Sequence, residues 1–86
     1  MNIYKKDLKP FFNIIDIRDR DLYEEGHIFD SINIPMNTLL NNVANYLNKK
    51  DIYYIYCEKG YNSKKTCDLL SILGYKVVNV IDGYRG

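Results

Sequence analysis

The chain of 86 residues is poor in several residue types that would assign it to a common class of protein. It has no tryptophan, one histidine and two cysteines, and its formal net charge is only +1. Two cysteines do not make a disulfide framework, and with a single histidine they do not make a zinc site. We therefore expect no metal and no cofactor. A charge this close to zero gives no basis for a surface that binds nucleic acid or membrane.

Long apolar segments are also absent. No run approaches the roughly 20 apolar residues that a membrane-spanning helix needs. The start, from Met1 to Phe12, contains lysines but no apolar core of a secretory signal. We therefore expect a cytoplasmic protein with both thiols reduced, folded as one domain over residues 1–86.

Segments with strand and helix character alternate along the chain. Runs rich in β-branched or aromatic residues predict strands over 2–4, 13–18, 31–34, 51–56 and 76–81. Helices are predicted over 6–12, 21–25, 36–48 and 63–73. Ser63 is the expected N-cap of the last helix, and Gly74 the residue that follows its end. This alternation predicts an α/β fold, with a small parallel β-sheet flanked by helices on both faces.

Seven residues between the predicted strand 51–56 and the last helix carry most of the functional information: Cys57-Glu58-Lys59-Gly60-Tyr61-Asn62-Ser63. Ligands of parallel sheets bind at the carboxyl ends of the strands, and Cys57 lies at such an end. The backbone N–H groups of the loop and the N-terminus of the helix favour a negative charge there. Gly60 can adopt the positive φ that such a loop requires. We therefore predict that the loop holds a reactive thiolate at Cys57.

Motifs along nearly the whole chain resemble the rhodanese-like family, in order and with matching spacing. They are Asp16-Ile17-Arg18, Gly26-His27-Ile28, Ile32-Asn33-Ile34-Pro35, the cysteine loop and Val80-Ile81-Asp82-Gly83. The resemblance implies a single-domain sulfurtransferase. Its loop cysteine, here Cys57, takes a sulfane sulfur from thiosulfate or a persulfide and passes it to a thiol or to cyanide. Residues 58–63 then form the loop that binds the substrate.

One loop position departs from the family pattern, because Asn62 stands where the sulfurtransferase loop usually has arginine. Asparagine brings no charge, and Lys59, Lys64 and Lys65 replace some of the positive field without a bidentate fork. Glu58 beside the thiol is expected to disfavour further negative charge. We therefore expect thiosulfate to be a poor donor and a protein or low-molecular-weight persulfide to be the natural one. The missing arginine also argues against a phosphatase function like that of related proteins, because the loop would lack the main residue that binds phosphate.

Other conspicuous residues have a structural explanation. We interpret Asp16 and Arg18 as an ion pair that supports the site, and His27 as part of a turn, not as acid–base catalysts. We interpret Cys67 as a small core residue. The sequence leaves open a disulfide between Cys57 and Cys67, which would require their Cα atoms to lie within about 7 Å.

Two tyrosines lie close to the loop in the sequence. The ring of Tyr61 either projects over the mouth of the pocket or lies on the surface. The family commonly continues after its last glycine element, here at Gly83, with a short helix that bears an aromatic residue. Either the domain is a minimal version, or Tyr84 takes part of that packing role. Three functions remain open: a persulfide carrier acting through Cys57, a non-catalytic binding module with a protein partner, and a thiol redox protein.

Overall fold

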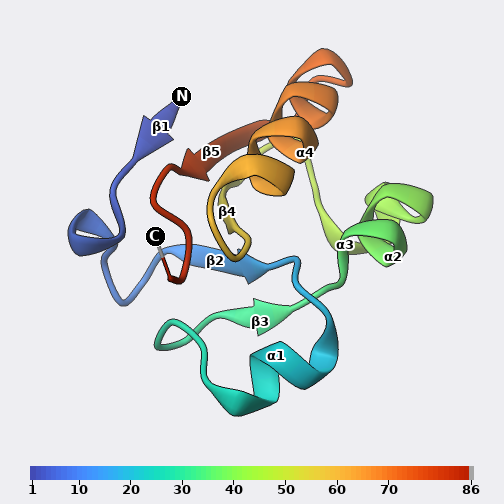
Figure 1. Ribbon diagram of the computed structural model, residues 1–86. Coiled ribbons are helices and arrows are strands. Elements are labelled where there is room, and N and C mark those ends of the chain that lie inside the picture. Colours follow the sequence, from blue (N-terminus) through green and yellow to red (C-terminus); the bar gives the residue numbers. More distant parts are fainter. Residues whose placement is uncertain (86) are drawn as a thin grey trace.

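A five-stranded parallel sheet forms the centre of the computed structural model, which describes residues 1–85 (Figure 1). The strands are β1 (Asn2–Ile3), β2 (Asn13–Asp16), β3 (Ile32–Asn33), β4 (Ile52–Tyr56) and β5 (Lys76–Val80). Their order across the sheet is β1-β5-β4-β2-β3, and every pairing is parallel. The helices are the 3-10 helix η1 (Lys5–Asp7), α1 (Arg20–Glu25), α2 (Met36–Asn41), α3 (Val43–Tyr46) and α4 (Tyr61–Ile72). The predicted α/β fold is confirmed.

The apolar side chains of the strands divide between the two faces of the sheet, because successive residues of a strand point to opposite sides. The larger cluster includes Ile15, Ile55 and Val77 of the strands together with Leu39 of α2 and Leu70 of α4. The smaller cluster lies on Ile14, Tyr56 and Val80 and is covered by parts of the chain that include Leu8, Phe12, Ile28 and Tyr84. Figure 1 shows α4 beside β4 and β5, the strands it contacts.

Three predicted helices differ from the observed ones by more than one residue. The segment 6–12 forms only the single turn η1, which ends before Pro10. The predicted helix 36–48 is interrupted at Asn42, whose φ of −144° and ψ of 38° separate α2 from α3. Helix α4 begins at Tyr61, because Gly60 takes a φ of 93° and acts as the N-cap in place of Ser63. Gly74 follows the helix with a φ of 96°, as predicted.

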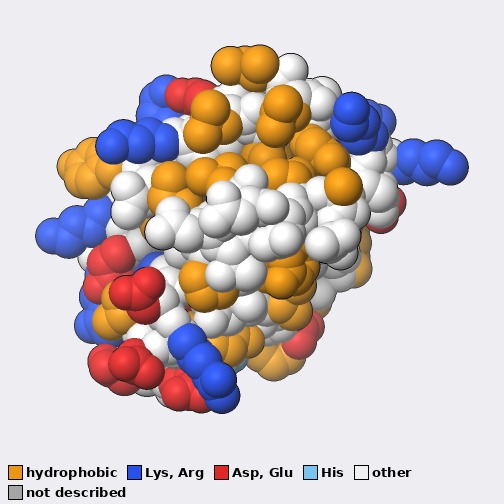
Figure 2. Space-filling model, turned by 90° about the vertical axis from the view of Figure 1, so that its right-hand side faces the viewer, with side chains coloured by type: hydrophobic (Ala, Val, Ile, Leu, Met, Phe, Trp, Pro, Cys, Tyr) orange, Lys and Arg blue, Asp and Glu red, His pale blue; other side chains and the backbone are white. Residues whose placement is uncertain are grey.

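The surface exposes hydrophobic side chains at the end of α4, where Leu69, Ile72 and the following Leu73 are accessible. Figure 2 shows hydrophobic side chains gathered in the upper half of the face in view, with acidic and basic side chains mainly at its margin. Within residues 1–85, no helix has both the length and the apolar character needed to cross a bilayer.

Candidate active site

The thiol of Cys57 lies under the first turn of α4, directly after β4. Its sulfur accepts hydrogen bonds from the N–H groups of Gly60, at 3.1 Å, and Ser63, at 3.2 Å. Gly60 is required here, because a Cβ atom on it would lie 2.1 Å from the carbonyl oxygen of Ile81. The side chain of Cys57 is nevertheless almost fully buried. The loop therefore aims two backbone donors at one sulfur, as an anion-binding loop does.

A buried hydrogen-bonded chain leads from this sulfur to β5. The thiol of Cys57 donates to Ser63 Oγ at 3.3 Å, and Ser63 Oγ donates to Asn79 Oδ1 at 2.5 Å. Both Ser63 and Asn79 are buried. Asn79 was missed by sequence reasoning, although a polar residue inside the apolar run Lys76 to Ile81 is a signal that could have found it.

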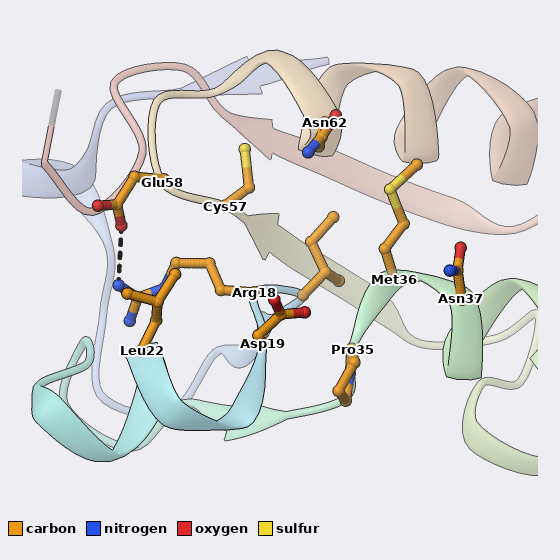
Figure 3. A pocket seen from close by; sticks show the side chains of 10 residues that line it. Arg18, Asp19, Leu22, Pro35, Met36, Asn37, Cys57, Glu58 and Asn62 are labelled. Carbon is orange, nitrogen blue, oxygen red and sulfur yellow. Dashed lines mark hydrogen bonds and ion pairs between the residues drawn. The ribbon is translucent and has the colours of Figure 1, made fainter.

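A cavity of about 340 Å³ opens beside the sulfur (Figure 3). The cysteine loop supplies one side, and the segment after β2, helix α1 and the start of α2 supply the others. Leu22, Pro35 and Met36 give it an apolar wall. Its full lining is Ile17, Arg18, Asp19, Leu22, Pro35, Met36, Asn37, Cys57, Glu58 and Asn62. A small molecule in this cavity would therefore meet the thiol, one guanidinium, two carboxylates and an apolar surface.

The guanidinium of Arg18 is held by two carboxylates. Its Nη2 donates to Asp16 Oδ2 at 2.8 Å and to the carbonyl oxygen of Gly26 at 2.7 Å, and its Nη1 donates to Glu58 Oε1 at 2.9 Å. The ring of Tyr84 lies 4.4 Å from the guanidinium carbon. Burial by itself lowers the pKa of Arg18, but the hydrogen bonds to Asp16 and Glu58 outweigh it, so this pKa is raised above its ordinary value. The ion pair expected between Asp16 and Arg18 is present.

Glu58 differs from the isolated negative charge that the sequence suggests. Its Oε1 pairs with Arg18 and its Oε2 pairs with Arg85 at 2.8 Å. The two guanidinium groups offset the negative field that Glu58 would otherwise place beside the thiol. Sequence reasoning missed Arg85, because this pairing depends on how the end of the chain folds back.

The segment after β5 fastens the cysteine loop through its backbone. The N–H of Tyr84 donates to the carbonyl oxygen of Cys57 at 2.9 Å, and the N–H of Arg85 donates to that of Glu58 at 3.0 Å. Gly83 permits this approach, because a Cβ atom on it would lie 2.6 Å from the Glu58 carbonyl oxygen. Tyr84 also packs against the smaller core cluster, which agrees with its expected packing role.

The two remaining residues with reactive side chains lie away from the cavity. His27 lies just after α1. Its Nδ1 is 2.8 Å from the carbonyl oxygen of Tyr23, and its ring stacks on the Tyr23 ring with 3.8 Å between the centroids. Cys67 is buried in the larger core cluster, and burial raises the pKa of its thiol to about 12. A thiol that stays protonated at neutral pH is a poor nucleophile. Both residues make structural contacts, and the roles expected for them stay predictions.

The exposed loop residues line a second, shallower hollow that also includes Cys57. Tyr61 begins α4 and is 75% exposed, and it lines this hollow with Cys57, Glu58, Lys59 and Asn62. Its side chain is therefore a largely exposed wall of this hollow. In the part of the chain that the structure describes, no three His, Cys, Asp or Glu residues are grouped to hold a metal ion.

Lys64, one of the lysines expected to supply positive field, pairs with Asp68 at 3.0 Å on the surface of α4. Both side chains are largely exposed. Such a pair contributes little to stability, and it directs part of the Lys64 charge away from the loop.

The family model for the rhodanese-like domain matches residues 2–86. The chain belongs to this family. The parallel sheet and the cysteine loop at its carboxyl edge agree with the resemblance found in the sequence.

Two relatives support this assignment. The chain is 35% identical over 82 residues to the Bacillus subtilis protein named "Putative sulfur carrier protein YrkF". This match covers 94% of the chain but only 44% of that protein, so the chain spans less than half of its length. It is 31% identical over 72 residues to the thiosulfate sulfurtransferase PspE of Escherichia coli, covering 83% of the chain and 69% of that protein.

Solved structures share the fold over almost the whole chain. The crystal structure of SSP1007 from Staphylococcus saprophyticus is 32% identical with a TM-score of 0.85, covering 99% of this chain and 92% of that one. A rhodanese-like domain protein from Staphylococcus aureus is 36% identical with a TM-score of 0.79, covering 93% of this chain and 78% of that one.

Proposed function

We propose that the protein is a sulfurtransferase that carries a sulfane sulfur as a persulfide on Cys57. The observation that carries this proposal is the position of the Cys57 sulfur, which accepts two backbone N–H groups and also borders an open cavity. Backbone donors fixed around an ionised sulfur stabilise its charge without needing to reorganise. Membership of the rhodanese-like family, and the names of its sulfur-transferring relatives, support the same class of reaction.

The reaction has two steps that balance without an external oxidant. The thiolate of Cys57 attacks the outer sulfur of a donor persulfide R–S–SH, so that a new S–S bond forms, the donor S–S bond breaks and R–S⁻ leaves. With thiosulfate the leaving group is sulfite. A thiolate or cyanide acceptor then attacks the outer sulfur on Cys57, takes it, and releases Cys57 as the thiolate. The N–H groups of Gly60 and Ser63 bind the inner sulfur whenever it carries charge.

The charges in the cavity favour a persulfide donor over thiosulfate. Thiosulfate is a dianion, and the cavity presents the carboxylates of Asp19 and Glu58. The guanidinium of Arg18 is already paired with Asp16 and Glu58, so little of its charge remains for an anion. The apolar wall suits the organic part of a low-molecular-weight or protein persulfide. Such a donor is therefore the proposed one, with a thiol as the acceptor.

Intact-mass measurement after incubation with glutathione persulfide tests the carrier function. We expect the mass of one sulfur to be added, to be lost on reduction, to be absent in Cys57→Ser and to persist in the control Cys67→Ser. No addition from either glutathione persulfide or thiosulfate would overturn the proposal in favour of a binding module. Loss of two hydrogens that depends on both cysteines would overturn it in favour of a redox pair.

A steady-state comparison tests the donor separately. We expect kcat/KM to be at least about tenfold lower with thiosulfate than with glutathione persulfide, which corresponds to about 1.4 kcal/mol. A thiosulfate value equal to or above the persulfide value, and abolished by Cys57→Ser, would refute the donor assignment while leaving the carrier function intact.

A further inference from the structure

The chain from Cys57 through Ser63 to Asn79 joins three elements at one buried place. Cys57 directly follows β4, Ser63 lies in the first turn of α4, and Asn79 lies in β5. Ser63 is 0% exposed, so bulk water does not reach its hydroxyl group. Every donor and acceptor that this hydroxyl uses must therefore come from the protein.

A serine hydroxyl has one proton, so Ser63 can donate only one hydrogen bond at a time. In the structure the Ser63 hydroxyl donates its hydrogen bond to Asn79 Oδ1 and accepts one from the thiol of Cys57. Once Cys57 is ionised, the sulfur has no proton to donate and becomes an acceptor. Ser63 can then donate to the sulfur only by turning its O–H away from Asn79.

The side chain of Asn79 can satisfy both arrangements, because an amide has an acceptor on one side and donors on the other. In the thiol state its Oδ1 accepts from Ser63, as observed. After a half-turn of the amide, its Nδ2 would donate to Ser63 Oγ while Ser63 donates to the sulfur. Aspartate at this position would only accept, and leucine would do neither.

We propose that Ser63 and Asn79 form a hydrogen-bond switch that supplies a third donor to the Cys57 sulfur when that sulfur is ionised. Ser63 contacts the reacting sulfur directly, and Asn79 is a positioning residue that acts through Ser63. The inference rests on the proposed function only in taking Cys57 as the reacting thiol. Its test measures ionisation and requires no sulfur transfer, so the two proposals can fail separately.

Several charged or titratable groups also face Cys57 and must remain unchanged in the test. Arg18, Asp19 and Glu58 line the cavity, and Lys59 and Tyr61 line the shallower hollow. From α4, the thiol of Cys67 stays neutral because burial raises its pKa to about 12. A substitution of Ser63 by alanine alters none of these groups, so a change in ionisation would report on the hydroxyl.

The test is the pH dependence of the alkylation of Cys57 by iodoacetamide, read by peptide mass on protein shown to be folded by circular dichroism. Loss of a hydrogen bond to a charged group predicts about a tenfold slower reaction of Ser63→Ala at neutral pH, with the midpoint about one pH unit higher. Thr66→Val is the matched control, because Thr66 is a buried hydroxyl of α4 that donates to the carbonyl oxygen of Asn62. An unchanged midpoint in Ser63→Ala, or an equal shift in the control, would overturn the proposal.

A double-mutant cycle separates the switch from a simple charge effect. Asn79→Asp should raise the midpoint of the Cys57 alkylation profile for two reasons. The carboxylate keeps accepting the Ser63 hydrogen bond, so Ser63 cannot donate to the sulfur, and it also adds a negative charge. In the Ser63→Ala background only the charge effect remains, so the shift caused by Asn79→Asp should be smaller by about one pH unit. Equal shifts in the two backgrounds would refute the switch. The neutral variant Asn79→Leu frees the Ser63 proton, so a midpoint raised as far as in Ser63→Ala would also contradict it.

Discussion

Replacing Arg18 by glutamine would remove the cation that holds the carboxyl edge of the sheet together. The side chains of Arg18 and Asp16 are only 2% and 0% exposed, and they are joined by hydrogen bonds of 2.8 to 3.1 Å. The change leaves Asp16 buried without its counter-ion. Glu58 keeps its second partner, Arg85, so the main loss is at Asp16.

The size of the loss follows from this burial. Breaking a buried ion pair by removing one partner costs about 3–5 kcal/mol, because the remaining charge is left uncompensated. A domain of this size has a total stability of about 4–13 kcal/mol at about 0.05–0.15 kcal/mol per residue. We therefore expect Arg18→Gln to lose a large share of its free energy of unfolding, and the loop attached to Glu58 to loosen with it.

Urea unfolding at neutral pH measures this loss, with Arg20→Gln as the matched control. Arg20 pairs with Glu24 at 3.3 Å, but both side chains are exposed, so its replacement should change the free energy of unfolding by less than about 1 kcal/mol. If Arg18→Gln cost no more than this control, Asp16 and Arg18 would not be the buried pair described, and the reasoning would fail.

Two further predictions concern the loop and the core. Gly60→Ala should destabilise the fold by about 2 kcal/mol or more and abolish sulfur loading, because its φ is 93° and its Cβ would meet the Ile81 carbonyl oxygen. Gly74→Ala should cost only about 1 kcal/mol, because its Cβ meets only the flexible Lys49 side chain. Urea unfolding that ranked these two variants the other way would contradict the close approach. Burial raises the pKa of Cys67 from 9.0 to about 12, so its contribution to stability is complete below pH 9.0 and is lost as the pH rises toward 12. Cys67→Ala should flatten the alkaline decline by up to about 1.4 kcal/mol per pH unit, and an unchanged decline in urea unfolding at alkaline pH would count against that pKa.

The fold could be predicted from the sequence where local pattern and tertiary structure agree. The runs around Ile15, Ile55 and Val78 are rich in β-branched and aromatic residues and form strands as predicted, and Gly74 follows the end of α4 as predicted. The cysteine loop was predictable for the same reason, since it joins a buried strand to a helix.

The errors arose where distant parts of the chain decide the outcome. Ser63 is of a residue type that favours the N-cap, but α4 begins two residues earlier, after Gly60 with its positive φ. The Ser63 hydroxyl instead donates a hydrogen bond to Asn79 of β5. The pairing of Glu58 with Arg85 likewise depends on contacts made by the segment after β5. Local propensity contains no information about such long-range partners.

The most direct test of the central claim is a single-turnover transfer. The protein is loaded with glutathione persulfide, separated from excess donor and mixed with cyanide, and the thiocyanate formed is counted against the protein. We predict about one thiocyanate per chain, the return of Cys57 to its unmodified mass, and no product from Cys57→Ser. Sulfur that loads elsewhere, or that stays on Cys57 when cyanide is added, would contradict a persulfide carrier.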